Sequence, residues 1–561
     1  MRDKKNKHFT WKKYHRWFGL VLSVFMLVFC VSGIILNHRQ LFADCDVSRS
    51  WMPPAYHIQN FNNGIIKGSI RIDGHADLAS AGGISASAGG IKASDDSVLA
   101  YGYGGIWLTD SKMKSWKDFN KGLPKNVDGR NIRNMVQTKD GEIWCAAMMD
   151  VYRFDGKEWR RFPLPDNHER IADIALTKDS MSLIAMTRSA VYEISDKKME
   201  TANNKMDTAS DERMATRKII AQPKGFTPTV TLFKTVWHLH SGAFFGLTGR
   251  LVVDAIAIVL IILSITGIIL FILPYRIRRQ KRLQARERMV KLGKQMVFNA
   301  KWHNKLGYAT IILTLWISIT GMCLRPPLMV PLAMNKTTEK VKDGNVWNDK
   351  LRAIRWDAAE GNWLVSTSEG FLRVDEHFLH TPTLLNKEKT PKVSPMGVTV
   401  FESDDKGGWL VGSFSGIFRW YPEKNLIVDY FTGKANIEKS MIPISSYLVS
   451  GYSKDFFDGK EVVFDYSKGA SFGNAESLRN AETKSFPAST PEVLSAIPMS
   501  LWNVALELHV GRCYSPFLGP LSDLFVFISG LLITLVLLSG YIILHRRKKQ
   551  RRSILSAKYS S

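Results

Sequence analysis

Histidines recur at matching places in two distant parts of this chain. His15 stands in "YHRWFG" and His303 in "WHNKLG", each four residues before a glycine and each at the start of a long apolar run. A single histidine at the edge of a membrane span is commonly an interfacial residue. Two imidazoles on facing helices, however, are a common way to hold haem iron in a helical bundle. Residue type and spacing therefore leave two interpretations, interfacial anchor and iron ligand.

A second pair, His240 and His509, recurs with its own constant offset of 269 residues. Neighbouring residues repeat with both pairs. His15, Gly19 and Gly33 match His303, Gly307 and Gly321 at an offset of 288, and His240, Gly242 and Asp254 match His509, Gly511 and Asp523 at 269. The later Gly267 matches Gly540 with a further displacement of four residues, which is one helical turn. The chain is therefore a span, a domain segment and a span, repeated once.

Four apolar segments must position these histidines. Each is close to the roughly 20 residues that a helix needs to cross about 30 Å of hydrocarbon. They cover residues 17–36, 251–273, 306–324 and 524–544. The first is too long and too evenly apolar for a signal peptide, so we interpret it as a retained span. The duplication predicts a four-helix bundle with an approximate two-fold axis along the membrane normal.

This symmetry predicts which histidines meet: His15 with His303 on the cytoplasmic side, and His240 with His509 on the exported side. Small residues let helices approach a flat macrocycle, and glycines follow all four histidines at short range (Gly19, Gly242, Gly307 and Gly511). A zinc site is disfavoured, because no cluster of cysteines or carboxylates accompanies the histidines.

Several other polar residues near the span ends are candidates for supporting roles. Arg250 and Arg512 lie near the exported pair and could contact haem propionates. Three histidines without clean duplicates are interfacial residues or reserve ligands: His38, His238 and His545. Asp254 and Asp523 lie at the starts of predicted spans, where burying an ionised carboxylate costs free energy. Helix capping or pairing with an arginine would explain them.

Charge predicts the topology. Residues 1–16, 276–301 and 546–561 hold seven, ten and seven Lys/Arg with at most one acid each, and they account for nearly all of the net charge of +25. Three short basic segments beside an even number of spans predict cytoplasmic termini and a cytoplasmic middle loop. The basic balance therefore reflects membrane insertion, and no base-reading motif indicates nucleic acid as a partner.

The predicted organisation follows from spans and charge. In order it has a cytoplasmic N-terminus (1–16), transmembrane helix 1 (17–37), a first exported propeller segment (38–240), transmembrane helix 2 (241–274), a basic cytoplasmic loop (275–303), transmembrane helix 3 (304–324), a second exported propeller segment (325–515), transmembrane helix 4 (516–545) and a basic cytoplasmic tail (546–561). Of the five cysteines, Cys45, Cys145 and Cys513 would face the exported side, where a disulfide could form between two of them.

The exported segments contain a repeat centred on tryptophan. "DGEIWCAAMMDVYRFD" (140–155) matches "EGNWLVSTSEGFLRVD" (360–375) and "KGGWLVGSFSGIFRWY" (406–421), with Trp144, Trp363 and Trp409 aligned. A degraded copy surrounds Trp107, and a weak one starts at Ile171. Short alternating strands with Gly/Asp turns at this spacing are typical of propeller blades. The fold class predicted is a membrane α-helical bundle plus an all-β propeller of about six to eight blades, built from both exported segments, with the tryptophans in its core. Residues 79–90 and 201–216 are expected to be surface loops.

The span motifs resemble those of a known family. "YHRWFGLVLSVFMLVFCVSGIIL", "LHSGAFFGLTGRLVVDAIAIVLIILSITGIIL" and "WHNKLGYATIILTLWISITG" are similar to the PepSY-associated transmembrane helix family. Some members resemble haem-containing inner-membrane reductases that act on ferric siderophores in the periplasm. The resemblance implies two b haems with ligands at His15, His303, His240 and His509, and a bacterial inner membrane location with the large domain periplasmic.

One departure affects the substrate more than the electron path: the exported segments look like propeller blades rather than PepSY modules. The cytoplasmic segments also lack a GxGxxG turn for a flavin or nicotinamide, so electrons would come from a quinol or a protein donor. The sequence thus predicts a haem b oxidoreductase that passes electrons to an exported ferric siderophore or other ferric chelate. The alternative is a non-enzymatic, membrane-anchored propeller that serves as a sensor or assembly factor.

Overall fold

The structure is a computed structural model that describes residues 2–72, 96–196, 213–341, 344–394, 397–435, 447–473 and 486–559. The chain divides into two compact units, each assembled from separate stretches of sequence. Residues 1–42, 229–339 and 501–561 form a helical unit, and residues 43–228 and 340–500 form a β unit. Each β segment is therefore an insertion between helices that pack together.

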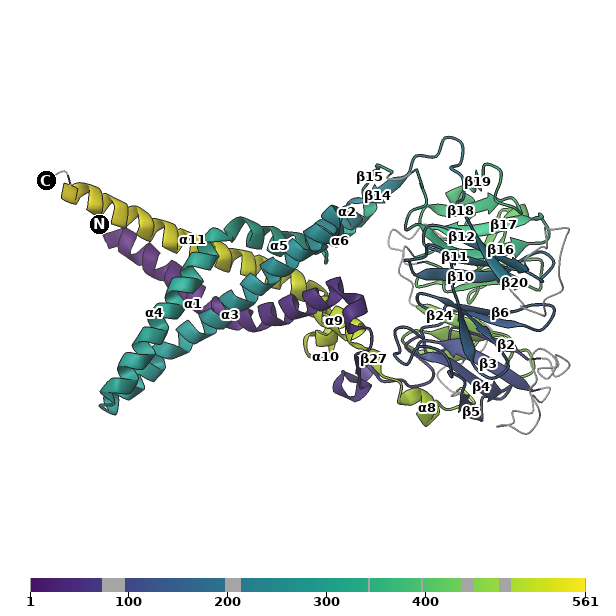
Figure 1. The fold of residues 1–561 in the computed structure, drawn as a ribbon, viewed down its shortest axis with the longest axis horizontal. Helices are drawn as coiled ribbons and strands as arrows, with labels where there is room; N and C mark the ends of the chain where they lie inside the picture. The colour runs from purple at the N-terminus through teal and green to yellow at the C-terminus, as the bar shows by residue number, and fades with distance from the viewer. Residues whose placement is uncertain are drawn as a thin grey trace, which may run out of the picture. The chain divides into compact units, whose positions relative to one another are not determined.

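The helical unit is built around long apolar helices. Within its described residues the bounds are α1 (Arg2–Asn37), α2 (Leu232–Ser241), α3 (Gly246–Arg282), α4 (Arg286–Ala309), α5 (Ile311–Cys323), α6 (Met329–Met334), α9 (Leu501–His509), α10 (Ser515–Leu518) and α11 (Ser522–Tyr559). Helix α1 packs along α3 and α11, and both chain termini lie at the same end of this unit (Figure 1). Strand β14 (Thr229–Thr231), just before α2, pairs antiparallel with β15 (Lys336–Thr338), just after α6.

In the described part of the chain, three helices are long and apolar enough to cross a membrane. They cover Trp11–Asn37, Ala243–Arg282 and Arg512–Gln550. The predicted third span differs, because α4 and α5 meet at a bend of 69° and count as a fourth span only when taken together. At this bend the Thr310 hydroxyl donates to the Leu306 carbonyl at 2.8 Å, a bond that competes with the backbone ladder and bends helices.

Two short helices end beside the second histidine pair. Helix α2 ends at Gly242 (φ 77°), and α9 is followed by Gly511 (φ 84°), both left-handed. Such a conformation strains any residue with a Cβ and ends a helix. These glycines therefore stop the helices that carry His240 and His509, a role different from the predicted approach to a macrocycle.

The β unit contains six antiparallel sheets in its described residues. Their strands are β2–β5 (Gly68–Arg71, Ser97–Gly102, Gly105–Asp110, Trp116–Asp118), β6–β9 (Asn134–Gln137, Ile143–Ala146, Val151–Phe154, Trp159–Phe162), β10–β13 (Ile171–Leu176, Leu183–Thr187, Val191–Asp196, Arg213–Lys218), β16–β19 (Leu351–Asp357, Asn362–Thr367, Gly370–Val374, Thr383–Leu384), β20–β23 (Val400–Asp404, Gly408–Ser413, Gly416–Tyr421, Leu426–Asp429) and β24–β26 (Val449–Ser453, Val462–Asp465, Gly469–Phe472). A further two-stranded pair joins β1 (Asp46–Val47) to β27 (Met499–Ser500).

The six sheets follow one another in a ring of contacts. Strands are in sequence order within every sheet, so each sheet is a simple meander. The first strand of each sheet touches the first strand of the next, in the order β2, β6, β10, β16, β20 and β24, and β24 touches β2 again. The sheet labels can be followed in Figure 1.

The tryptophan repeat corresponds to equivalent positions in three sheets. Trp144, Trp363 and Trp409 lie on the second strands β7, β17 and β21, and all three are buried. The prediction that they belong to the core is confirmed. Trp107 is also buried but lies on β4, a third strand, so the predicted alignment of its copy was wrong. The motif "GGIWLTDS" matches the strand that follows the repeat tryptophan in other sheets.

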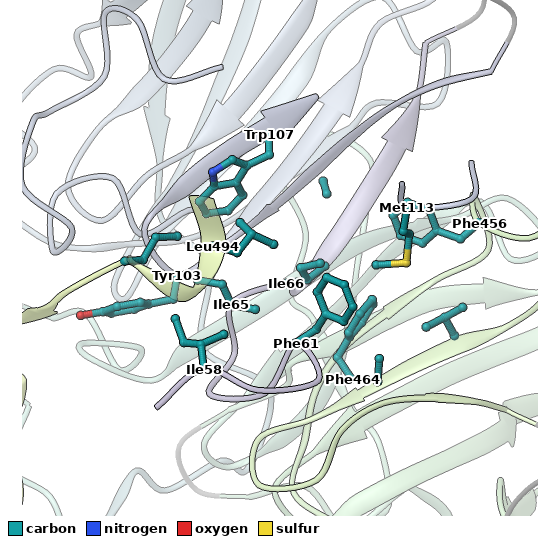
Figure 2. Close-up of a cluster of buried hydrophobic side chains, with 14 of the residues drawn as sticks. Ile58, Phe61, Ile65, Ile66, Tyr103, Trp107, Met113, Phe456, Phe464 and Leu494 are labelled. Carbon is teal, nitrogen blue, oxygen red and sulfur yellow. The ribbon is translucent and has the colours of Figure 1, made fainter. Parts of the chain in front are cut away.

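Residues from both inserted segments share one core. In the cluster of Figure 2, Phe61 and Trp107 of the first segment lie with Phe456, Phe464 and Leu494 of the second. A second cluster likewise mixes β11 with β16–β18. Because burial of apolar surface drives folding, the two segments stabilise each other at these two clusters, which agrees with the prediction that both contribute to one domain.

The structure bears on the predicted loops at 79–90 and 201–216 and on the possible disulfide. Residues 79–90 lie outside the described residues. Of the predicted loop 201–216, the described part is not a loop: Arg213–Lys218 forms strand β13, which pairs with β12. All five cysteines lie in the described part of the chain and are free.

Candidate functional site

The four repeated histidines lie as two close pairs in the helical unit. The ring centroids of His15 and His303 are 6.4 Å apart, and those of His240 and His509 are 6.1 Å apart. His15 lies on α1 and His303 on α4, whereas His240 and His509 end α2 and α9. The pairs are those that the constant sequence offsets predict to meet.

Each histidine uses its Nδ1 atom in the same way. Nδ1 lies within hydrogen-bond distance of a serine or threonine hydroxyl on another helix. The pairs and distances are His15 to Ser539 (2.9 Å), His303 to Thr266 (2.9 Å), His240 to Thr320 (3.1 Å) and His509 to Ser32 (3.0 Å). Four separate contacts of one kind indicate a specific orientation of the rings rather than chance packing.

The hydroxyl groups determine the tautomer of each ring. Each donates its single proton to a carbonyl of its own helix: Ser32 to Val28 (2.6 Å), Thr266 to Ile262 (2.6 Å), Thr320 to Trp316 (2.8 Å) and Ser539 to Val536 (2.7 Å). The oxygen therefore accepts from the imidazole, and Nδ1 carries the hydrogen. In a neutral ring the lone pair then belongs to Nε2.

Two backbone carbonyls support this assignment. The Val536 carbonyl lies 3.1 Å from Nδ1 of His15, and the Phe29 carbonyl lies 3.1 Å from Nδ1 of His509. A carbonyl only accepts, so Nδ1 must donate in both. Among the described residues, Nε2 of these four rings makes no hydrogen bond. Among the described residues, each of these lone pairs is therefore left available to a ligand.

A glycine directly follows each of the four hydroxyl residues and receives the ring. An added methyl group would lie 2.8 Å from Cε1 of His240 at Gly321, and 2.9 Å from Cε1 of His15 at Gly540. The corresponding distances are 3.4 Å to His509 at Gly33 and 3.5 Å to His303 at Gly267. Each (Ser/Thr)-Gly dipeptide thus supplies one hydrogen bond and the room for one imidazole.

Every one of these contacts crosses between the two halves of the duplication. His15 and His240 of the first half bond to Ser539 and Thr320 of the second, while His303 and His509 of the second half bond to Thr266 and Ser32 of the first. The four contacts are therefore related by the approximate two-fold symmetry that the sequence predicts, and they tie the halves together.

The donor set fits a haem held by two axial imidazoles. An imidazole nitrogen binds a metal at about 2 Å. Two such bonds plus the radii of two rings place the centroids about 6 Å apart, as in both pairs here. Within the described residues no group of three or more His, Cys, Asp or Glu side chains is arranged for a metal ion. The candidate ligands are therefore the two imidazole pairs.

The other candidate residues make contacts of different kinds. Nε2 of His38 lies 2.7 Å from Asp254, and Asn37 donates to the same carboxylate at 3.1 Å. Asp254 is thus held by a histidine and an amide, which is neither the helix capping nor the arginine pairing expected. The His238 ring lies tilted against Trp237, and His545 stacks on Tyr541. The structure does not bring these three histidines into the two pairs.

The two arginines predicted to contact propionates have different surroundings. Arg512 donates to Glu507 in the same half, with Nε to Oε2 at 2.8 Å. Arg250 is exposed on α3. Asp523 lies 3.4 Å from Arg325, which agrees with the expected arginine pairing for that acid.

The sequence model of the PepSY-associated TM region matches residues 1–273 and again residues 177–547. The two matches overlap and together cover almost all of the chain.

This chain belongs to the PepSY-associated TM region family.

Two matches in a family model of this kind agree with the duplication seen in the histidine contacts. No curated protein matches the chain. As a PepSY-associated membrane protein, the chain carries a large β unit between its helices.

Comparison with solved structures gives only distant similarity. The extracellular domain of a protein described as a one component system from B. thetaiotaomicron is 11% identical, with a TM-score of 0.33 over 73% of this chain. The match spans 40% of that protein's chain, less than half its length. The β-propeller domain of Cps50 (Swd1) from Myceliophteria thermophila is 11% identical, with a TM-score of 0.29 over 74% of this chain and 88% of that one.

Sequence reasoning missed the hydroxyl residues of this family member's site. The repeats in the sequence align Gly33 with Gly321 and Gly267 with Gly540. The residues before these glycines are Ser32, Thr320, Thr266 and Ser539. A hydroxyl at the same place in all four helices was the signal that could have identified them.

Proposed function

We propose that this protein is a haem-binding oxidoreductase that passes electrons across a membrane. The observation that carries the proposal is the repeated arrangement of four imidazoles, each with Nδ1–H on a hydroxyl and each with an Nε2 lone pair beside a partner ring. Ring nitrogens fixed by a bond from the other nitrogen are typical of metal-ligating histidines.

Haem b would supply a one-electron couple whose potential depends on its axial ligands and surroundings. His15 with His303, and His240 with His509, are the proposed ligands of two haems. The hydroxyls of Ser32, Thr266, Thr320 and Ser539 hold the rings in one tautomer and raise the basicity of Nε2. The glycines keep Cε1 of each ring close to a helix backbone, which restricts ring rotation.

The proposed setting is a bacterial inner membrane, with both termini and the basic 276–301 loop in the cytoplasm and the β unit in the periplasm. The bent α4–α5 pair is then the fourth span. Basic segments beside the spans support this orientation. A quinol or a protein donor would supply electrons, and a ferric siderophore or other ferric chelate would accept one electron per iron.

For the β unit we propose a six-bladed propeller. Its support is the ring of first strands, which returns from β24 to β2, and the meander order within each sheet. Closure of such a ring protects strand edges and buries the side chains between neighbouring sheets.

A vesicle experiment tests the proposed function. The full chain is reconstituted with haem into vesicles that enclose dithionite, and ferric citrate is added outside together with a chelator that reports ferrous iron. We expect ferrous iron outside only with the protein, and its loss in the His15→Ala/His240→Ala double variant. His380→Ala is the matched control, since His380 is exposed in the β unit. Equal rates in the double variant and in the wild type would exclude this function.

A second candidate is a membrane-anchored sensor or assembly factor, in which the helices only hold the β unit in place. An enclosed polar cavity among the first strands of the β unit favours it. The two functions separate in cells that depend on the protein: a sensor keeps its activity in the double histidine variant, and an oxidoreductase loses it.

A further inference from the structure

The β unit encloses a polar cavity of about 110 Å³ where its six sheets converge. Every sheet contributes to the lining, from the first strand or the residue just before it. The contributors are Lys67 before β2, Asn134 on β6, Asp173 on β10, Arg355 on β16, Glu402 on β20 and Tyr452 on β24. The cavity therefore lies within the β unit, where the first strands of its six sheets meet.

The lining carries a surplus of positive charge. In the described part of the chain it includes two carboxylates, Asp173 and Glu402. It also includes six cationic side chains: Lys67, Arg133, Arg170, Arg188, Arg352 and Arg355. Like charges gathered in a cavity with low-dielectric walls repel strongly, and an anion relieves that repulsion.

Both carboxylates of the lining contact the same arginine, Arg355. Arg355 donates to Asp173 at 2.7 Å and lies 3.5 Å from Glu402. Burial by itself would lower the pKa of Arg355, but the two carboxylates outweigh it and the pKa rises. The Glu402 side chain is 49% exposed, and partial desolvation raises its pKa despite Arg355. With both carboxylates ionised this trio carries one net negative charge, against five other cations in the lining.

The hydrogen bonds of Lys67 and Arg352 go to neutral acceptors. Lys67 donates to the side-chain oxygen of Asn131 and, at 2.8 Å, to the Ile132 carbonyl. Arg352 donates to the Asp349 and Leu351 carbonyls at 2.9 and 2.8 Å, while its buried Nε has no hydrogen-bond partner among the described residues.

The pKa values of both cations are depressed. Burial, and then the charge of Arg133, hold the pKa of Lys67 well below its usual range. Burial and the nearby Arg188 lower the pKa of Arg352 to about 10, and together they outweigh the opposing effect of the Asp349 carboxylate. A buried cation without a counter-charge is costly for folding, so such cations commonly mark a place for a bound anion.

We propose that the central cavity of the β unit binds a small oxyanion, a carboxylate or a phosphate, through Lys67 and Arg352. Guanidinium and ammonium donors form short, charge-assisted bonds with both kinds of oxygen. Asp173 and Glu402 orient Arg355, while the surplus of positive charge in the lining disfavours a cationic ligand. The size of the cavity limits the ligand to a small molecule or to one anionic group of a larger one.

Titration calorimetry on the full chain in phosphatidylcholine nanodiscs tests this site, with citrate, inorganic phosphate and pyrophosphate as probes at constant ionic strength. We expect saturable binding of one molecule per chain by at least one probe. Because each charge-assisted bond is a large share of such a site's affinity, Arg352→Gln and Lys67→Met should each weaken binding by about tenfold or more. Arg352→Lys should retain part of it.

Arg160→Gln is the matched control, since Arg160 is an exposed arginine of the same unit. It should bind as the wild type does. Thermal unfolding of every variant shows that the β unit is folded. The proposal is overturned if no probe binds saturably, or if Arg352→Gln and Lys67→Met bind as tightly as Arg160→Gln.

The citrate arm and the two phosphate arms separate the possible ligand classes. This site does not depend on haem: the His15→Ala/His240→Ala variant should bind the oxyanion with unchanged affinity. In the wild type, saturable oxyanion binding without electron transfer would contradict only the oxidoreductase, and electron transfer without oxyanion binding would contradict only this site.

Discussion

The helical unit and the β unit are both built from repeats, but the repeats carry different things. In the helical unit the repeated residues are the polar ones, four histidines with four hydroxyls and four glycines. In the β unit the repeated residues are buried tryptophans, and the polar residues of the cavity differ from sheet to sheet. A repeat of polar groups indicates a shared chemical task, whereas a repeat of apolar groups indicates a shared way of packing.

The largest expected effect is a loss of stability on removal of a repeated tryptophan, which should affect the β unit alone. Trp363 is buried at 1% exposure and donates its indole N–H to the Glu376 carbonyl. Trp363→Ala should lower the free energy of unfolding of the β unit by about 3–5 kcal/mol and leave the haem content of the helical unit unchanged. Thermal unfolding and the absorption spectrum measure both. Trp51, 85% exposed, gives the matched Trp51→Ala control with little effect.

The glycines of the helical unit offer a graded comparison within one histidine pair. Gly321→Ala places a methyl group 2.8 Å from Cε1 of His240, so the ring must move, whereas Gly33→Ala leaves an ordinary contact of 3.4 Å with His509. We expect Gly321→Ala to lose most of the haem from this pair and Gly33→Ala to retain it. Haem bound per chain is the measurement. Equal losses in the two variants would show that ring position is not set by these glycines.

The hydroxyls should matter less than the rings that they orient. Thr320→Val removes the acceptor of the His240 Nδ1–H at nearly constant volume. Loss of such a supporting bond typically weakens metal binding by about 10–100-fold. The variant should therefore release haem to an apo-myoglobin trap faster than the wild type. Thr235→Val, on the same helix as His240 but bonded only to the Thr231 carbonyl, is the control.

The smallest effect concerns the cavity and depends on pH. The depressed pKa of Lys67 means that the folded chain binds fewer protons than the unfolded chain below the usual value of 10.5. The free energy of unfolding therefore rises with pH up to that value, as this penalty is lost. Lys67→Met removes this pH-dependent contribution of Lys67. The stability of the wild type relative to Lys67→Met should therefore increase between neutral pH and about pH 10. A constant difference would contradict the uncompensated charge of Lys67.

The sequence predicts the histidine pairs because a constant offset is a geometric constraint. Residues related by a two-fold axis meet when they lie near it, and this needs no knowledge of side-chain contacts. The bend between α4 and α5 could not be foreseen in the same way. It lies in an apolar run without proline, and the Thr310 hydroxyl bond that accompanies it is common in straight helices.

In the β unit, three sheets can be predicted from the repeated tryptophans in the sequence, and the other sheets cannot. The sheet β24–β26 contains no tryptophan, although its first strand closes the ring of contacts. The cavity residues were not predicted at all. Each sheet contributes a different side chain, and Lys67 becomes neighbour to Arg133 only when the sheets are brought together.

The central claim is that two pairs of imidazoles hold two haems, and haem stoichiometry tests it most directly. Pyridine haemochrome and protein assays on the purified full chain, expressed with ample haem, should give two b haems per chain. His15→Ala and His240→Ala should each give one haem, their combination none, and His380→Ala two. A wild-type protein without a Soret band, or histidine variants that keep two haems, would contradict the account.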